Sequence, residues 1–173
     1  MSTAVDAPVV ARDIEVLVEQ ARVVHRIVRM NTDGLTEEDS LVRPEPGGNC
    51  LNWVVGHLVC VYNAVLPAVG QETVMSKEAL ERYERGSKPL LEPAEALPLT
   101  KLLDAWDEAS QRYQVGLAAM TPDQLDQPAP FTPRKNPDET VRSLLAIIAF
   151  HQAYHAGQTG LLRRIAGKDG AMK

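Results

Sequence analysis

The chain has 173 residues, of which 45% are hydrophobic and 24% are charged, an ordinary composition for a globular protein of one domain (1–173). Its net charge of −5 argues against nucleic acid as the main partner, because phosphate contacts need a basic surface. No apolar run approaches the roughly 20 residues of a membrane span, and the N-terminus lacks the features of a signal peptide. We therefore expect a cytoplasmic protein that binds neither nucleic acid nor membrane.

The first predicted element is a helix from about Ala11 to Met30, after a tail over residues 1–8 that we expect to be disordered. Its apolar residues recur at helical spacing and predict one core-facing stripe, formed by Ile14, Leu17, Val18, Ala21, Val24, Ile27 and Val28. Gly34 suits a left-handed cap at the C-terminal end. His25 lies at the edge of the stripe, where a single histidine is more often a hydrogen-bonded boundary residue than a metal ligand.

A second helix is predicted from Cys50, with Asn49 as its N-cap. One of its faces is apolar and consists of Val54, His57, Leu58, Val61 and Val65. His57 lies in the middle of this stripe, which is an unusual place for an imidazole. Pro67 and Gly70 predict the end of the helix or a kink.

The next segments are a short polar helix over residues 76–85, with Ser76 as its N-cap, and a third long helix over residues 99–120. Residues 121–138 then contain five prolines. Long loops of this kind are often functional lids, and a surface connection pinned by prolines is an equal alternative. A fourth helix is expected to begin at residues 136–138 or at Thr140 and to end near Gly167.

The fourth helix carries His151 and His155 on its apolar stripe. Two residues four apart lie about 40° from each other around a helix and roughly 6 Å apart along it, so both imidazoles project from one face. His57 is placed in the same way on the second helix. The alternative is three core histidines satisfied by hydrogen bonds, but burying three imidazoles without a shared partner repeats a desolvation cost. We therefore predict an all-α four-helix bundle, with a short extra helix and a metal site between facing helices.

Three neutral imidazoles can supply nitrogen ligands to zinc at about 2.0–2.1 Å and leave a position open, as in a catalytic rather than a structural site. Nickel, iron, manganese and cobalt accept similar ligands. Gln158 and Asn52 could orient a metal ligand or could be ordinary polar residues at a helix boundary. Gly157 lets a neighbouring helix or a ligand come close. No carboxylate is spaced to be an obvious general base beside the histidines.

Three segments of the chain are distinctive: Asn52-Trp53-Val54-Val55-Gly56-His57-Leu58, His151-Gln152-Ala153-Tyr154-His155-Ala156-Gly157-Gln158 and Leu161-Leu162-Arg163-Arg164, and the first two contain the most specific motifs, W-x3-H and H-x3-H-x-G-Q. In this order they resemble the DinB/YfiT-like superfamily of metal-binding four-helix bundles, which is unrelated to the DNA polymerase that shares the DinB name. The resemblance extends over nearly the whole chain. It implies an up-down-down-up bundle, frequent homodimers, and a divalent metal ion, zinc or nickel, held by His57, His151 and His155.

Characterised proteins of this superfamily include transferases that use bacillithiol and an isomerase that uses mycothiol. The chain ends soon after the fourth helix, so we expect it to lack the extra C-terminal domain of some mycothiol-using members. The resemblance thus predicts a metal-dependent enzyme acting on a small molecule. A thiol S-transferase comes first and a hydrolase second, because a thiol supplied by the substrate needs a general base less. The alternatives are a non-catalytic small-molecule-binding or stress-response protein and a structural dimer with a vestigial site.

Overall fold

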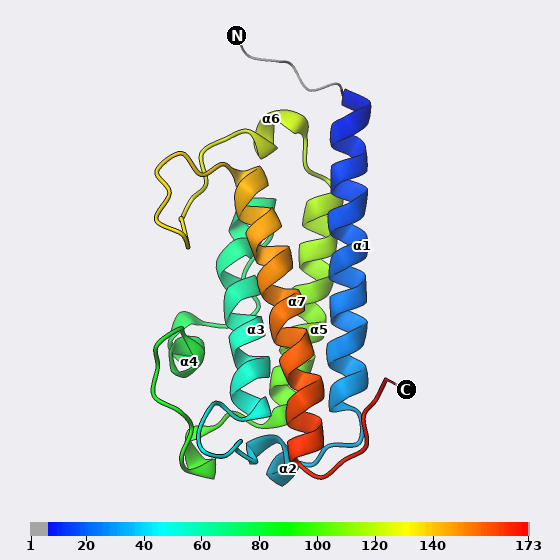
Figure 1. Ribbon diagram of the computed structural model, residues 1–173. Helices are drawn as coiled ribbons and strands as arrows, with labels where there is room; N and C mark the ends of the chain where they lie inside the picture. Colours follow the sequence, from blue (N-terminus) through cyan, green and yellow to red (C-terminus); the bar gives the residue numbers. More distant parts are fainter. Residues whose placement is uncertain (1–6, 173) are drawn as a thin grey trace.

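Four long helices form an up-down-down-up bundle in the computed structural model, which describes residues 7–172 (Figure 1). They are α1 (Ala7–Thr32), α3 (Leu51–Val65), α5 (Leu99–Ala118) and α7 (Val141–Ile165). In Figure 1, α1 and α7 run in one direction and α3 and α5 in the other. α1 and α3 each pack against both α5 and α7, which makes α3 and α7 neighbours. Residues 7–172 contain an isolated bridge but no strand, so the predicted all-α bundle is confirmed.

The core lies along the inner stripes of these helices, as the apolar periodicity predicted. At its centre Tyr62 of α3 stacks on Trp106 of α5, with ring centroids 5.1 Å apart, and on Tyr113, with centroids 4.6 Å apart. The stretch Leu51–Val69 is the single candidate among the described residues that is long and apolar enough to span a membrane. Because 72% of its apolar window is buried inside the bundle, this stretch serves as a core helix of the fold.

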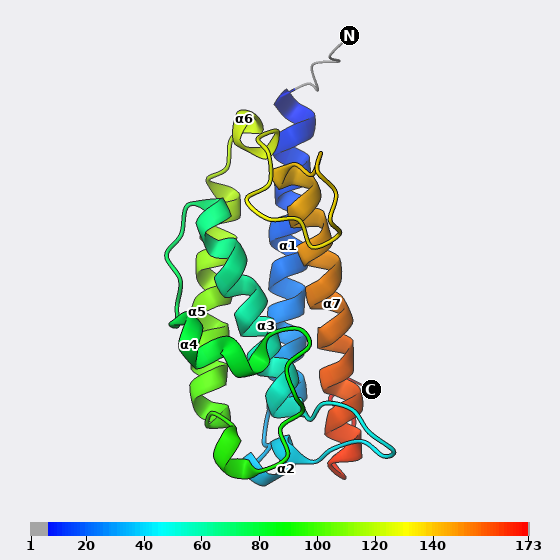
Figure 2. The same cartoon turned by 90° about the vertical axis from the view of Figure 1, so that its left-hand side faces the viewer.

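The connections between the long helices contain short helical segments: α2 (Glu37–Leu41), η1 (Leu66–Val69), α4 (Lys77–Leu80), η2 (Glu81–Tyr83), η3 (Pro93–Glu95) and α6 (Pro122–Leu125). The predicted short helix over residues 76–85 is present as α4 and η2, and the Oγ of Ser76 accepts a hydrogen bond from the Ala79 N–H at 3.3 Å. Figure 2 shows the chain after α4 passing across the outer side of α3. This crossing is what brings the η2 segment to the histidines.

The ends of the helices differ from the predictions by a few residues. α1 begins at Ala7 rather than Ala11, since alanine and an early proline both suit a first turn. Of the tail predicted to be disordered, residues 7 and 8 belong to α1, and residues 1–6 lie outside the described part. Cys50, not Asn49, is the N-cap of α3, a shift of one residue at a boundary that frays easily. Thr140, the second of the predicted starts, caps α7.

The proline-rich connection over residues 121–138 is a pinned surface connection. The Ala129 N–H donates to the Glu139 carbonyl oxygen at 2.7 Å, and the Arg134 Nη2 donates to the Glu139 carboxylate at 2.6 Å. The Glu139 side chain is fully buried behind that ion pair. None of residues 121–138 lines the cavity over the histidines, so the structure favours the surface connection over a lid at this cavity.

Candidate metal site

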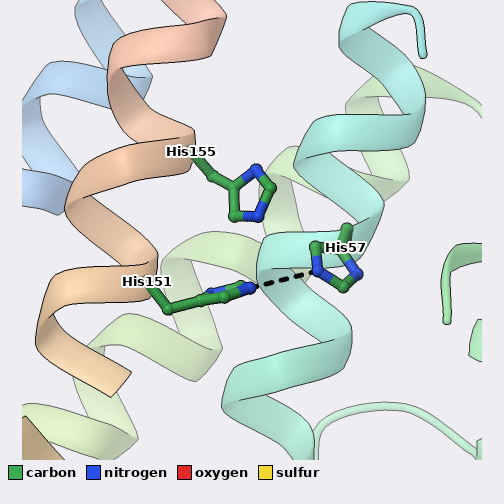
Figure 3. A group of neighbouring side chains, drawn as sticks. All are labelled: His57, His151 and His155. Atoms are coloured by element: carbon green, nitrogen blue, oxygen red, sulfur yellow. Dashed lines mark hydrogen bonds between the residues drawn. The ribbon is translucent and has the colours of Figure 1, made fainter. Parts of the chain in front are cut away.

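Three histidines from two helices meet between α3 and α7. Figure 3 shows His151 and His155 one turn apart on α7, both pointing toward His57 on α3. The Nε2 atoms of His57 and His151 are 3.2 Å apart, and one ring nitrogen from each of the three residues lies within 4.8 Å of the others. The structure thus brings together the three residues that sequence spacing selected.

Hydrogen bonds on the far side of two rings settle which nitrogen points into the site. The Nδ1–H of His57 donates to the Tyr83 carbonyl oxygen at 2.7 Å, and the Nδ1–H of His155 donates to the Gln158 Oε1 at 2.6 Å. A neutral imidazole with its proton on Nδ1 presents a lone pair at Nε2. Both Nε2 atoms are therefore ready to act as ligands. Gln158 is a positioning residue, which resolves one of the two interpretations that the sequence left open.

The third ring, His151, is followed in the chain by a buried amide, Gln152. Its Nδ1 and the Oε1 of Gln152 are both buried and both without a hydrogen-bond partner within residues 7–172. The Gln152 Nε2 donates to the Leu58 carbonyl oxygen at 3.1 Å, which holds the amide in place between α7 and α3. Burial lowers the pKa of His151, and the neighbouring Gln152 side chain opposes that shift. These two unpartnered atoms, a ring nitrogen and an amide oxygen, are a complementary donor and acceptor when the His151 proton is on Nδ1.

A polar network behind His57 fixes the carbonyl that orients it. The Tyr83 hydroxyl donates to the Asn52 Oδ1 at 3.1 Å and accepts from the Leu97 N–H at 2.8 Å. The Asn52 Nδ2 donates in turn to the Leu97 carbonyl oxygen at 2.9 Å. Asn52 therefore acts on His57 indirectly, through Tyr83, and not by a direct hydrogen bond to the imidazole as the sequence suggested. The network ties η2 to the first turn of α3.

Gly56 allows Tyr83 to reach this position. A Cβ at Gly56 would overlap the Tyr83 ring, so any other residue would push η2 away from α3. No other element of the described chain comes within 4 Å of a Cβ built on Gly157, the glycine predicted to let a neighbouring helix or a ligand come close. The neighbouring-helix part of that prediction is wrong for the described chain, and the approach of a ligand stays a prediction. Within the fold, the close approach occurs at Gly56, beside His57.

The tryptophan of the W-x3-H segment packs on the first histidine. Trp53 stacks on His57 with ring centroids 4.8 Å apart and planes 14° from parallel. Its Nε1–H donates to the Ser87 Oγ at 3.0 Å and to the Arg82 carbonyl oxygen at 3.2 Å. Trp53 therefore positions the imidazole and anchors residues 82–87 over the site.

All three imidazoles are held neutral. Burial lowers the pKa of His57 and of His155, and burial together with the two neighbouring rings lowers the pKa of His151 to about 4. A neutral imidazole is the form that binds metal. The donor set also fits: two ligands at about 2.0–2.1 Å from zinc with a tetrahedral angle between them lie roughly 3.3 Å apart, close to the 3.2 Å between His57 and His151.

A cavity of about 770 Å³ opens over the three rings. One wall is apolar, and the exposed side chains of Phe150, Tyr154 and Leu161 continue it outward along α7. Arg85 contributes the one permanent charge of the lining, and no carboxylate among the described residues lines it. The site is thus a face of three nitrogen ligands with open space on the other side.

The fourth histidine is not part of this group. The His25 Nε2 on α1 lies 2.8 Å from the Asp107 Oδ1 on α5, at the edge of the bundle. This is the boundary role predicted for it. Tyr83, Gln152 and Arg85 were not predicted as functional. Tyr83 acts through its backbone carbonyl, which the residue type does not reveal, and Gln152 lies on the apolar stripe of its helix like a core residue. Arg85 lies in a turn, where no periodic pattern applies. Gly56, beside His57, was the one local sign in the sequence that another segment packs closely against this part of α3.

Comparison with known proteins agrees with this architecture. The family model of the DinB superfamily matches residues 20–159, and the chain belongs to that superfamily. A solved structure, described as the conserved protein of locus from Enterococcus faecalis, is similar over 89% of this chain and 97% of its own, with a TM-score of 0.69 and 17% sequence identity. That likeness shows the fold. No curated protein matches the chain.

Proposed function

We propose that this protein is a divalent-metal-dependent enzyme of the DinB superfamily, with His57, His151 and His155 as its metal ligands and zinc or nickel as the ion. The observation that carries the proposal is the convergence of three neutral imidazoles on one point beneath an open cavity. A structural zinc site is closed by four protein ligands, whereas this group leaves one side open. When bound, the ion supplies Lewis acidity that lowers the pKa of a coordinated water or thiol.

The protein's own residues favour a thiol as the nucleophile. Hydrolysis gains from a general base, and no carboxylate of the described chain lines the cavity. A thiol needs less help, because it is already partly ionised near neutral pH. The apolar wall, which includes Phe150, Tyr154 and Leu161, offers a surface for an apolar electrophile. We therefore rank transfer of a low-molecular-weight thiol first and metal-dependent hydrolysis second.

The test is turnover by the metal-loaded protein with a panel of small thiols and an electrophile such as an alkyl or aryl halide. We expect loss of free thiol above the background rate, abolished in His57→Ala and kept in His25→Ala, which removes a histidine outside the site. Retained turnover in His57→Ala would contradict the proposal. No turnover across a broad panel, with metal bound, would favour the non-catalytic small-molecule-binding protein. A homodimer and a cytoplasmic location remain predictions.

A further inference from the structure

Arg85 is the one charged side chain of the described cavity lining, and the proposed metal chemistry does not use it. It lines the same cavity as His57, His151 and His155, and its charge contributes to lowering the pKa of two of those rings. Its side chain is exposed and forms no hydrogen bond or ion pair within residues 7–172. The neighbouring Arg82, by contrast, pairs with Glu95 at 2.9 Å and points to a different surface. An unpaired guanidinium at the cavity is therefore available to a ligand.

The segment that carries Arg85 is held in place by the same contacts that orient His57. Tyr83, two residues earlier, accepts the hydrogen bond from His57, and Trp53 donates to Arg82 and Ser87 on either side of Arg85. The Ser87 Oγ donates to the Arg82 carbonyl oxygen at 2.7 Å and closes the turn. The backbone of Arg85 thus keeps a defined position relative to the three histidines, although its side chain is in solvent.

The charge pattern of the cavity selects for anions. Among the described residues, the lining contains one guanidinium and no carboxylate, although the chain as a whole carries a net charge of −5. A guanidinium binds a carboxylate through two parallel hydrogen bonds, a geometry that a lysine ammonium does not provide. Arg85 is the one cationic side chain of the described lining, and its single positive charge matches the single negative charge of a carboxylate.

We propose that Arg85 is the specificity residue of this cavity and binds the carboxylate of a small ligand whose other end reaches the three histidines. This inference rests on the proposed function for the identity of that other end, a thiol. The ligand class is then a thiol that also carries a carboxylate, as opposed to a neutral thiol of the same length.

The test compares 3-mercaptopropionate with 3-mercapto-1-propanol, which differ in the charge of the end distant from the thiol. Calorimetry on the metal-loaded wild type is expected to show about tenfold tighter binding of the anion, the size of one charge-assisted contact. Arg85→Ala should lose this preference and keep its affinity for the neutral thiol, and Arg85→Lys should keep part of it. Lys88→Ala removes an equal charge three residues away, outside the lining, and should behave as the wild type.

Two further readouts separate this inference from the metal proposal. The metal content of every sample is measured, and the Arg85 Nε–Hε signal of the metal-free protein is followed by NMR during titration with each thiol. A wild type that binds no metal counts against the proposed function, and a shift of the Arg85 signal by the anion alone still supports this inference. Equal binding of the two thiols by metal-loaded wild type, or an unchanged preference in Arg85→Ala, overturns it.

Discussion

At the scale of single residues, the site depends on groups that never touch a metal ion. His57 points its Nε2 inward because the Tyr83 carbonyl accepts from its other nitrogen, and Tyr83 is there because Gly56 has no side chain. His155 depends on Gln158 in the same way. Such outer contacts set the tautomer and direction of a ligand, and their loss weakens metal binding even when the ligand remains.

Substitution of Gly56 tests this dependence. In Gly56→Ala the new methyl group would overlap the Tyr83 ring, so we expect a loss of about 1–3 kcal/mol in unfolding free energy. We also expect weaker metal binding, because the carbonyl that orients His57 must move. The matched control is Gly157→Ala, which meets no described atom within 4 Å and should gain up to about 1 kcal/mol from helix propensity. Urea unfolding measures the change in stability, and metal titration measures the change in metal affinity. Equal values for Gly56→Ala and Gly157→Ala would refute the role of Gly56.

At the scale of elements, the long helices and their inner faces follow from sequence, whereas the crossing segment does not. Apolar spacing placed His57, His151 and His155 on core-facing stripes. The start of α7 at Thr140 was one of the two predicted starts of that helix. The path of η2 across α3 depends on contacts distant in sequence, such as Tyr83 with Asn52, so no local pattern indicates it. Arg85 was missed for the same reason, because only the fold brings its turn to the cavity.

The N-terminal cap of α7 gives a prediction at this scale. The Thr140 Oγ1 accepts from the Ser143 N–H at 3.3 Å, and the Ser143 Oγ accepts from the Thr140 N–H at 3.0 Å. Thr140→Ala should therefore cost about 1 kcal/mol of unfolding free energy, the usual value of an N-cap. Metal binding should be unchanged, because His151 lies three turns further along the helix. Chemical denaturation and metal titration check both parts; unchanged stability would show that the cap contributes nothing here.

At the scale of the whole molecule, three neutral histidines, one buried and two half-buried, make the metal-free fold sensitive to mild acid. The ordinary histidine pKa is 6.5, and the pKa of His151 in the fold is about 4, with the pKa of His57 and His155 also lowered. Below pH 6.5 the unfolded chain therefore binds more protons than the folded one. The unfolding free energy of the folded state must then fall as the pH falls.

This gives a pH prediction for the metal-free protein. Between pH 6.5 and 5, above the range in which carboxylates titrate, we expect a loss of roughly 1–2 kcal/mol after allowance for solvent screening of these partly exposed rings. The loss should continue toward pH 4. Urea unfolding at stepped pH measures it, and saturating zinc should oppose it by binding the folded form. A stability that is flat or rising as the pH falls over this interval would contradict the account.

The central claim is that three imidazoles from α3 and α7 bind one divalent ion. Elemental analysis of the protein, purified without chelator and dialysed after incubation with zinc or nickel, tests it most directly. We expect about one ion per chain in the wild type and in His25→Ala, and a nearly complete loss in His57→Ala, His151→Ala and His155→Ala. A wild type that retains no ion, or a His57→Ala variant that stays fully occupied, would contradict the claim.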